Sequence, residues 1–234
     1  IVTDSLRVDQ VGVYGSETET PNMDRLAQEG IIFKRAYSEN LPTLPMRRSW
    51  WTGSYHFHEA GWQPFPLQDK LLAEVLWDKG YTSALITDTY HMHKPSFNCG
   101  RGFDTTIFVR GQEYDPWIVK KRPLYEVEKS SWHRLRSYDD QETKAKWIKS
   151  FTQYLKNCTV RETEEDYYAP RVIKKSIKWL QEVTRRQKDK LFLWVDLFDP
   201  HEPWDPPEPF RSMYKDSEYE GPDLVDPVPG EIKG

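Results

Sequence analysis

Three aspartates of this 234-residue chain stand at the ends of apolar, strand-like runs. Asp4 follows the first run, Asp88 the second, and Asp199 the third, with His201 close behind it. The carboxyl ends of neighbouring parallel strands meet at one sheet edge, where ligands of such sheets bind. Carboxylates there suit Ca²⁺ or Mg²⁺ and also bind Zn²⁺. The pattern predicts a polar site at this edge. Taken alone, Asp4 is more often a helix cap or a loop carboxylate than a metal ligand.

A second group of polar residues lies in the segment Thr43-Leu44-Pro45-Met46-Arg47. Proline favours the first turn of a helix, and the free N–H groups at a helix N-terminus attract anions. Arg47 follows Thr43 by about one helical turn and so shares its face. Its guanidinium suits a tetrahedral oxyanion or the nucleophile's own oxygen. Two interpretations stay open: both residues act on an ester, or Thr43 caps the helix and Arg47 solvates its surface.

Apolar periodicity predicts the elements that position these residues. We expect strands over residues 1–3, 31–33, 81–86 and 191–197, and helices over 21–29, 67–79 and 172–183. Helix and strand in alternation indicate an α/β fold, a largely parallel central sheet flanked by helices. Residues from about 111 to 166 show weak periodicity and many charges, which predicts an insertion or excursion over the sheet edge. The proline-rich tail from Pro203 predicts an extended loop.

Ordered motifs along the chain resemble the opening of the sulfatase family of the alkaline phosphatase superfamily. These motifs are Thr3-Asp4-Ser5-Leu6-Arg7, residues 20–30 (Thr-Pro-Asn-Met-Asp-Arg-Leu-Ala-Gln-Glu-Gly), residues 43–53, residues 80–86, Gly102-Phe103-Asp104 and Asp199-Pro200-His201-Glu202-Pro203. The resemblance runs from residue 1 to about 210. It implies an alkaline phosphatase-like fold and a metal-dependent hydrolase acting on a small anionic ester.

The resemblance also implies the roles of individual residues. Asp4 and Thr43 correspond to ligands of a divalent metal, which is Ca, Mg, Mn or Zn. Thr43, Arg47, His91 and His201 correspond to catalytic residues, with His91 on the substrate oxyanion and His201 facing the substrate or its leaving group.

The chain departs from the family pattern at its nucleophile. Sulfatases convert a Cys or Ser at this place to formylglycine, and Thr43 cannot yield that aldehyde. Direct attack by the threonine hydroxyl would give a covalent phosphothreonine, as the nucleotide pyrophosphatase/phosphodiesterase branch and related phosphonate hydrolases imply. We therefore favour a phosphate or phosphonate ester as the substrate. A sulfuric ester hydrolase that acts without formylglycine remains an alternative.

Two further departures favour a third function, that of a non-catalytic sulfatase-like binding protein. Ser5 stands where the family places a second carboxylate, and the family's Gly-Lys-x-His pattern fits His91 only with a one-residue gap. His91 and His93 alternate, so on a strand they would point to one site. Otherwise they are surface histidines on a loop. Lys94 is a further candidate for the lysine of that family pattern.

Composition excludes some classes of partner. The net charge is −4 with scattered Lys and Arg, which gives no electrostatic footprint for nucleic acid or an anionic membrane. No apolar run reaches the roughly 20 residues of a membrane-spanning helix. We expect a soluble protein, with the cytoplasm slightly favoured and oligomeric state open. Cys99 and Cys158 are too few for a disulfide scaffold, and Asn157-Cys158-Thr159 fits a glycosylation triplet.

No segment after residue 201 resembles the Asp-His or Asp-Asn metal pair of the family's second half. We therefore expect residues 1–234 to form an N-terminal catalytic domain, incomplete at both ends, with the remaining metal ligands beyond Gly234. Tryptophans 50, 51 and 62 near the proposed site are expected to pack rather than line a pocket. His56, His58 and His133 have no supporting pattern and are interpreted as ordinary histidines.

Overall fold

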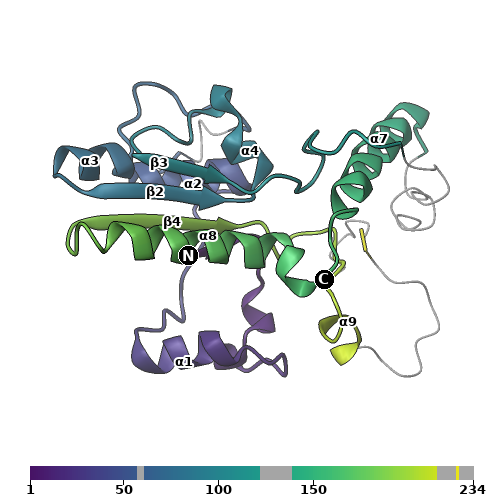
Figure 1. Ribbon diagram of the computed structural model, residues 1–234, viewed down its shortest axis with the longest axis horizontal. Helices are drawn as coiled ribbons and strands as arrows, with labels where there is room; N and C mark the ends of the chain where they lie inside the picture. Colours follow the sequence, from purple (N-terminus) through teal and green to yellow (C-terminus); the bar gives the residue numbers. More distant parts are fainter. Residues whose placement is uncertain (57–60, 122–138, 215–224, 227–234) are drawn as a thin grey trace.

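The computed structural model describes residues 1–56, 61–121, 139–214 and 225–226. Four parallel strands form one sheet in the order β1-β4-β2-β3 (Figure 1). They are β1 (Val2–Thr3), β2 (Thr82–Thr87), β3 (Thr105–Phe108) and β4 (Leu191–Leu197). The predicted α/β fold with a parallel sheet is confirmed.

Helices cover both faces of this sheet and extend beyond its end (Figure 1). The helices are α1 (Pro21–Glu29), α2 (Thr43–Thr52), α3 (Leu72–Asp78), α4 (Tyr90–His93), α7 (Gln141–Cys158), α8 (Tyr168–Val183) and α9 (Phe210–Met213). Short 3₁₀ turns are η1 (Val8–Gln10), η2 (Gly12–Tyr14), η3 (Pro95–Phe97) and η4 (Glu164–Asp166). None of the helices in these described ranges combines the length and apolar character that crossing a membrane requires.

Successive residues of the central strands point to opposite faces and build two cores. Ala84 and Ile86 of β2 pack with Val172 of α8 in one core. Leu85, between them, packs with Leu44 of α2 in the other. The sheet is therefore buried on both sides, which explains why β2 and β4 read as nearly continuous apolar runs.

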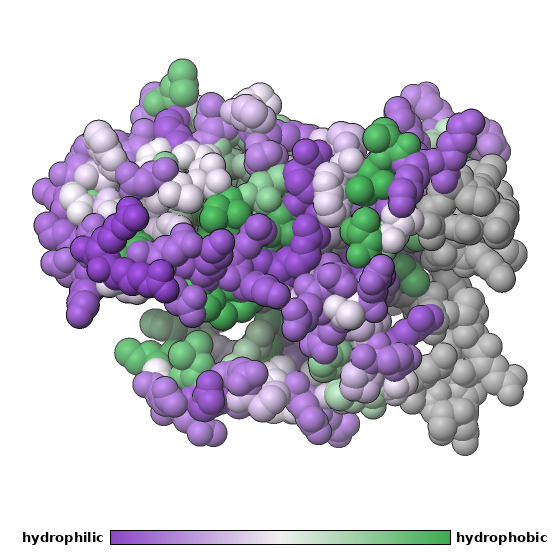
Figure 2. Space-filling view, viewed as in Figure 1, coloured by the Kyte–Doolittle hydropathy of each residue, from purple (hydrophilic) through white to green (hydrophobic). Residues whose placement is uncertain are grey.

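The segment around α1 departs from expectation. The helix has the predicted bounds, but none of its residues is buried. The strand predicted over residues 31–33 is wrong: Ile31 and Phe33 are 83% and 71% exposed, and no described strand pairs with them. A strand forms only where another strand accepts its hydrogen bonds, and β1 pairs only with β4 here. Figure 2 shows apolar atoms at the surface of this segment.

Other helices and strands differ from their predicted bounds for local reasons. The helix predicted from residue 67 begins at Leu72, because Leu71 is extended and the Glu74 carboxylate accepts from its backbone N–H at 2.8 Å. The strand β3 was not predicted, since its run Thr-Thr-Ile-Phe is short and half polar. The predicted extended tail contains the short helix α9. The strand β4 has its predicted bounds, and the helix α8 ends at Val183 as predicted but begins earlier, at Tyr168.

The excursion over residues 111–166 contains α7, which lies beyond the carboxyl ends of the strands in Figure 1; its residues 122–138 lie outside the described part. Asn157 on α7 is fully buried. Its amide donates to the carbonyl oxygens of Gly111 and Asp115, both at 2.8 Å, and its oxygen accepts from the N–H of Ile118 at 3.1 Å. The triplet at residues 157–159 is thus a packing feature, because a buried asparagine offers no acceptor for a glycan.

Replacing Asn157 by Ala should destabilise the fold by roughly 2–4 kcal/mol, because the Gly111 and Asp115 carbonyls each lose a donor, the Ile118 N–H loses its acceptor, and a small void opens. The measurement is the free energy of unfolding in denaturant. The matched control is Thr159→Ala, which also destroys the triplet but alters an exposed hydroxyl that bonds only to the Lys156 carbonyl. Equal effects of the two changes would contradict this role of Asn157.

Candidate active site

Thr43 is the first residue of α2, directly after Pro42, as predicted. Its side chain is largely buried, and the N-terminal half of the helix around it is buried as well. Arg47 follows one turn later on the same helix. The sequence therefore places a hydroxyl and a guanidinium side by side at the N-terminus of a helix, where free N–H groups favour an anion.

Arg47 does not solvate the surface of the helix; it is 3% exposed and joins two carboxylates. Its Nε and Nη2 donate to both oxygens of Asp196 at 2.9 Å, and Nη2 also donates to Asp4 at 3.1 Å. Burial alone lowers the pKa of Arg47, but the charges of Asp196 and Asp4 outweigh it and raise that pKa above its ordinary value. The guanidinium is thus a fixed, permanent positive charge, with Nη1 outside these bonds.

Asp196 is the functional residue that the sequence analysis missed. It lies near the end of β4, fully buried, where it also accepts from the Trp194 indole at 2.9 Å and the Thr89 hydroxyl at 3.2 Å. The available signal was a single acid in an otherwise apolar strand, Leu-Phe-Leu-Trp-Val-Asp-Leu. A buried carboxylate needs a partner, so such an acid predicts a buried cation nearby.

Asp4 lies just past β1, with its N–H donating to the Leu197 carbonyl at 2.9 Å. One carboxylate oxygen accepts from Arg47 and the other from the Ser5 hydroxyl at 3.2 Å. A divalent cation needs four to eight ligands. The described residues hold no group of three or more His, Cys, Asp or Glu side chains placed for a metal. The described residues therefore form no complete metal site around Asp4, and the assignment of Asp4 and Thr43 as metal ligands stays a prediction.

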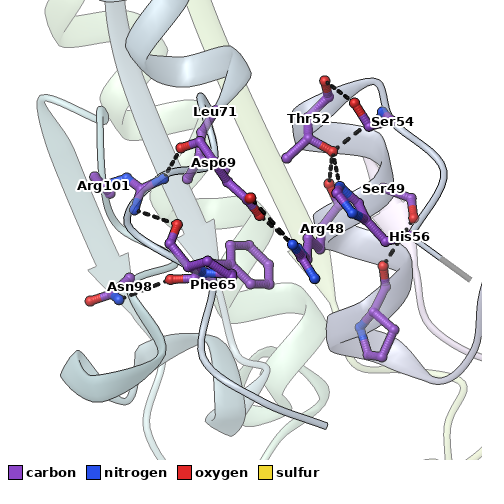
Figure 3. Close-up of polar contacts among 12 residues, drawn as sticks. Arg48, Ser49, Thr52, Ser54, His56, Phe65, Asp69, Leu71, Asn98 and Arg101 are labelled. Atoms are coloured by element: carbon purple, nitrogen blue, oxygen red, sulfur yellow. Dashed lines mark hydrogen bonds and ion pairs between the residues drawn. The ribbon is translucent and has the colours of Figure 1, made fainter. Parts of the chain in front are cut away.

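The second turn of α2 is anchored by a neighbouring loop (Figure 3). Arg48 donates to both carboxylate oxygens of Asp69, at 2.6 and 3.2 Å. Figure 3 shows Arg101 on the other side of this loop, bonding to the Asp69 carbonyl. The next residue, Ser49, bonds to Glu39. These contacts fix the direction of α2 and hence the placement of its first turn.

His91 and His93 lie on the short helix α4, so their predicted common face is wrong. His91 is buried, with its Nε2 at 3.1 Å from the Glu113 carboxylate and 3.3 Å from the Tyr114 hydroxyl. His93 instead stacks on Phe108 at 4.0 Å, and burial lowers its pKa. The strand interpretation failed because the chain turns into a helix directly after β2.

Lys94, the third candidate of that group, lies over the ring of Tyr90 at 4.6 Å. Its ammonium therefore packs on aromatic faces beside His91.

His201 stacks on Phe198 at 4.3 Å between ring centroids. Its Nδ1 lies 2.8 Å from the Glu202 carbonyl oxygen, so Nδ1 carries the hydrogen and Nε2 is left for a ligand. The ring borders a cavity of about 340 Å³ whose other walls include Glu113, Tyr114 and side chains of α7. This volume lies in the range of small-molecule sites.

Asp88 and Asp199 have a different character from Asp4. Asp88 is fully buried and accepts from the Phe198 N–H at 2.8 Å. Burial, and next the charge of Asp199, raises the pKa of Asp88 well above its ordinary value. Burial likewise raises the pKa of Asp199. Asp88 thus joins the ends of β2 and β4 through its bond to the Phe198 N–H.

Arg47 is hydrogen-bonded to Asp4, and it lies one helical turn after Thr43 on α2. In the part of the chain that is described, no hydrogen bond or ion pair links His91 or His201 to these three residues. His56 bonds to Thr52 at 2.9 Å at the far end of α2, whereas His58 and His133 lie outside the described residues.

The three tryptophans near the site differ in their surroundings. Trp51 is buried in the core, as expected. Trp50 is half exposed, and the Arg47 guanidinium carbon lies over its indole ring, 5.2 Å from the ring centroid. Trp62 packs edge-on against His91 at 4.6 Å.

Comparison with solved structures places this arrangement in a known fold. The phosphonate monoester hydrolase of Agrobacterium radiobacter superposes with a TM-score of 0.61 at 20% identity, covering 92% of this chain and 43% of that one. A protein solved in complex with its substrate D-glucosamine-2-N,6-O-disulfate gives a TM-score of 0.53 at 23% identity, covering 88% of this chain and 34% of that one. At these identities, the likeness shows a shared fold.

Curated relatives are similar over parts of the sequence. The N-acetylgalactosamine-6-sulfatase of Homo sapiens is 29% identical over 160 residues, which are 60% of this chain and 30% of that protein. An uncharacterized sulfatase of Escherichia coli (strain K12) is 27% identical over 229 residues, 94% of this chain and 41% of that protein. The chain thus spans less than half the length of these relatives. The family model described as Sulfatase matches residues 1–225, and the chain belongs to the sulfatase family.

Proposed function

We propose that the protein hydrolyses a small anionic ester with Thr43 as its nucleophile, and that the ester is a phosphate or a phosphonate. The observation that carries this proposal is the buried Arg47 guanidinium, fixed by Asp4 and Asp196 one turn from Thr43. A guanidinium held by the protein's own carboxylates pays no reorganisation cost when charge develops on an ester oxygen. The free N–H groups at the start of α2 favour the same charge.

The proposed reaction has two displacement steps. The Thr43 oxygen forms a bond to phosphorus while the bond from phosphorus to the leaving oxygen breaks, and the leaving oxygen takes up a proton. Water then cleaves the phosphothreonine and Thr43 regains its hydrogen. His201 Nε2 is the proposed proton donor to the leaving group, which requires the imidazolium form because Nδ1 already bonds to Glu202. His91 is the proposed contact to the ester oxygens.

The charges of the site support a divalent cation as part of this proposal. Asp4 and Asp196 carry two formal negative charges against one on Arg47, which leaves a net repulsion toward an anionic ester. We propose that Ca, Mg, Mn or Zn offsets it, with Asp4 and Thr43 among the oxygen ligands and others from outside the described residues. A cation there lowers the cost of negative charge on the Thr43 oxygen.

A sulfuric ester is the second candidate substrate, because the named relatives of this chain are sulfatases. The residue type at position 43 favours phosphate or phosphonate instead. A sulfatase with formylglycine expels sulfate by returning to its aldehyde, and a threonine has no such route. A covalent sulfothreonine would have to be cleaved by water directly.

Thr43→Ala should lower kcat for an activated aryl ester by roughly 10³-fold or more, because the nucleophile is lost. Thr43→Ser is the matched control, since it keeps the hydroxyl, and it should retain activity within about tenfold. Steady-state kinetics on the protein in its longest natural form give both numbers. Survival of activity in Thr43→Ala would show that another group attacks.

The 4-nitrophenyl esters of a phosphodiester, a phosphonate and sulfate share one leaving group and separate the two candidate substrates. We expect kcat/KM to be at least about tenfold higher for a phosphorus ester, because a threonine nucleophile suits that chemistry. A preference for the sulfate ester that depends on Thr43 supports the second candidate. Hydrolysis of none of them favours the non-catalytic binding protein.

Removal of divalent metal by a chelator should abolish this hydrolysis, and one of the four metals should restore it. Asp4→Asn should weaken metal binding by roughly 10-fold or more, measured by titration with the metal, because it removes a charged oxygen ligand. The matched control is Asp9→Asn, an exposed acid of the same segment whose one ion-pair partner among the described residues is Arg7. Full activity in metal-free protein would rule out the cation.

A further inference from the structure

The turn after β3 brings a carboxylate to His91. Glu113 Oε2 lies 3.1 Å from His91 Nε2, and the hydroxyl of the next residue, Tyr114, lies 3.3 Å from the same nitrogen. Glu113 has a φ of 51°, the left-handed conformation that residues with a side chain rarely adopt. Backbone strain of this kind persists only where surrounding contacts enforce it, and it accumulates at functional sites.

The turn that holds Glu113 is rigidly anchored. Within it, the Asp115 carboxylate accepts from the Gly111 N–H at 2.9 Å and from Arg110 at 2.6 and 2.7 Å. From outside it, Asn157 of α7 binds the carbonyls of Gly111 and Asp115, and the Tyr168 hydroxyl of α8 donates to Gly111 at 2.8 Å. Two helices thus fix the turn from which Glu113 points to His91.

Gly111 is required at the base of this turn. Its φ is +120°, and a Cβ there would meet Trp117 and the Tyr168 hydroxyl at 2.8 Å. Only glycine lets the chain pass between these two aromatic side chains. The placement of Glu113 therefore depends on glycine at position 111.

The two ring nitrogens of His91 have different surroundings. The Glu113 carboxylate lies 3.1 Å from Nε2 as an ion-pair contact, without the geometry of a hydrogen bond. A carboxylate has no hydrogen to donate, and its negative charge at this distance favours a hydrogen on Nε2 over a lone pair there. The other nitrogen, Nδ1, is buried and has no hydrogen-bond partner among the described residues. Trp62 and Tyr90 pack against the ring and restrict its rotation. Nδ1 is therefore the atom of His91 that is left for a ligand.

We propose that Glu113 is a positioning residue: it fixes the Nε2–H form of His91 and thereby reserves Nδ1 for the bound ester or the attacking water. The inference rests on the proposed function, since that function gives His91 its place at the substrate. A carboxylate that holds one nitrogen of a catalytic histidine sets both its orientation and which nitrogen exchanges protons. The residue comes from the charged excursion after β3, which no motif of the sequence linked to His91.

The test is Glu113→Gln, which preserves size but lets an amide N–H₂ face Nε2 and favour the opposite tautomer. The ¹⁵N signals of the His91 ring, assigned with His91→Gln, should move toward the Nδ1–H form. With a phosphorus ester, kcat should fall by roughly 100-fold while KM stays within about threefold. Glu165→Gln, an exposed acid paired with Lys174, should change neither readout.

The two readouts separate this inference from the function it rests on. An unchanged tautomer in Glu113→Gln, or a changed tautomer with unchanged kcat, overturns the positioning role. Tyr114→Phe removes the hydroxyl near Nε2 but keeps the carboxylate, so it should preserve the Nε2–H tautomer. If Tyr114→Phe shifts the tautomer and Glu113→Gln does not, the hydroxyl holds the ring and the inference fails. Absence of ester hydrolysis in the unmodified protein, with the tautomer shift intact, locates the failure in the proposed function.

Discussion

One buried ion cluster determines how this domain is put together: the Arg47 guanidinium between the carboxylates of Asp4 and Asp196. Its three members come from α2 and from the ends of β1 and β4. Removing one member of such a cluster leaves an uncompensated buried charge, at a cost of about 3–5 kcal/mol. The first strand, the last described strand and the helix that carries Thr43 are therefore locked in register by the groups that form the candidate site.

This ion cluster limits the movement of the Arg47 side chain. An arginine held by two carboxylates from the sheet cannot swing toward a ligand, so a ligand must bind where the guanidinium already lies. The Arg48–Asp69 pair and the Glu39–Ser49 contact fix α2 from two further sides. Fixed donors suit chemistry in which charge appears at one defined oxygen.

Much of the fold could be predicted from the sequence, because β2, β4 and α8 carry strong apolar periodicity bounded by glycine or polar turns. The position of Thr43 at a helix start followed from Pro45, and Arg47 from helical spacing. The strand over residues 31–33 could not be excluded, since apolar residues predict a strand only where a partner strand exists. His93 was misplaced because the backbone turns into α4 within three residues of β2.

Asp196 and Glu113 could not be assigned from the sequence, for one physical reason. Each acts on a residue far along the chain, 149 residues in the case of Asp196 and Arg47. Local patterns do not encode such contacts, whereas a helix start or a strand run is a local property. A single acid within an apolar strand is a usable signal, but a glutamate in a charged excursion has no such contrast with its neighbours.

The buried Asn157 has a consequence for how this protein can diverge. Its amide links α7 to the turn that holds Glu113, across 46 residues of sequence to Gly111. A shift of α7 would therefore be passed through one buried amide to the turn that carries Glu113. The exposed positions of α7 can thus diverge, while the asparagine at 157 is constrained by the turn that it holds.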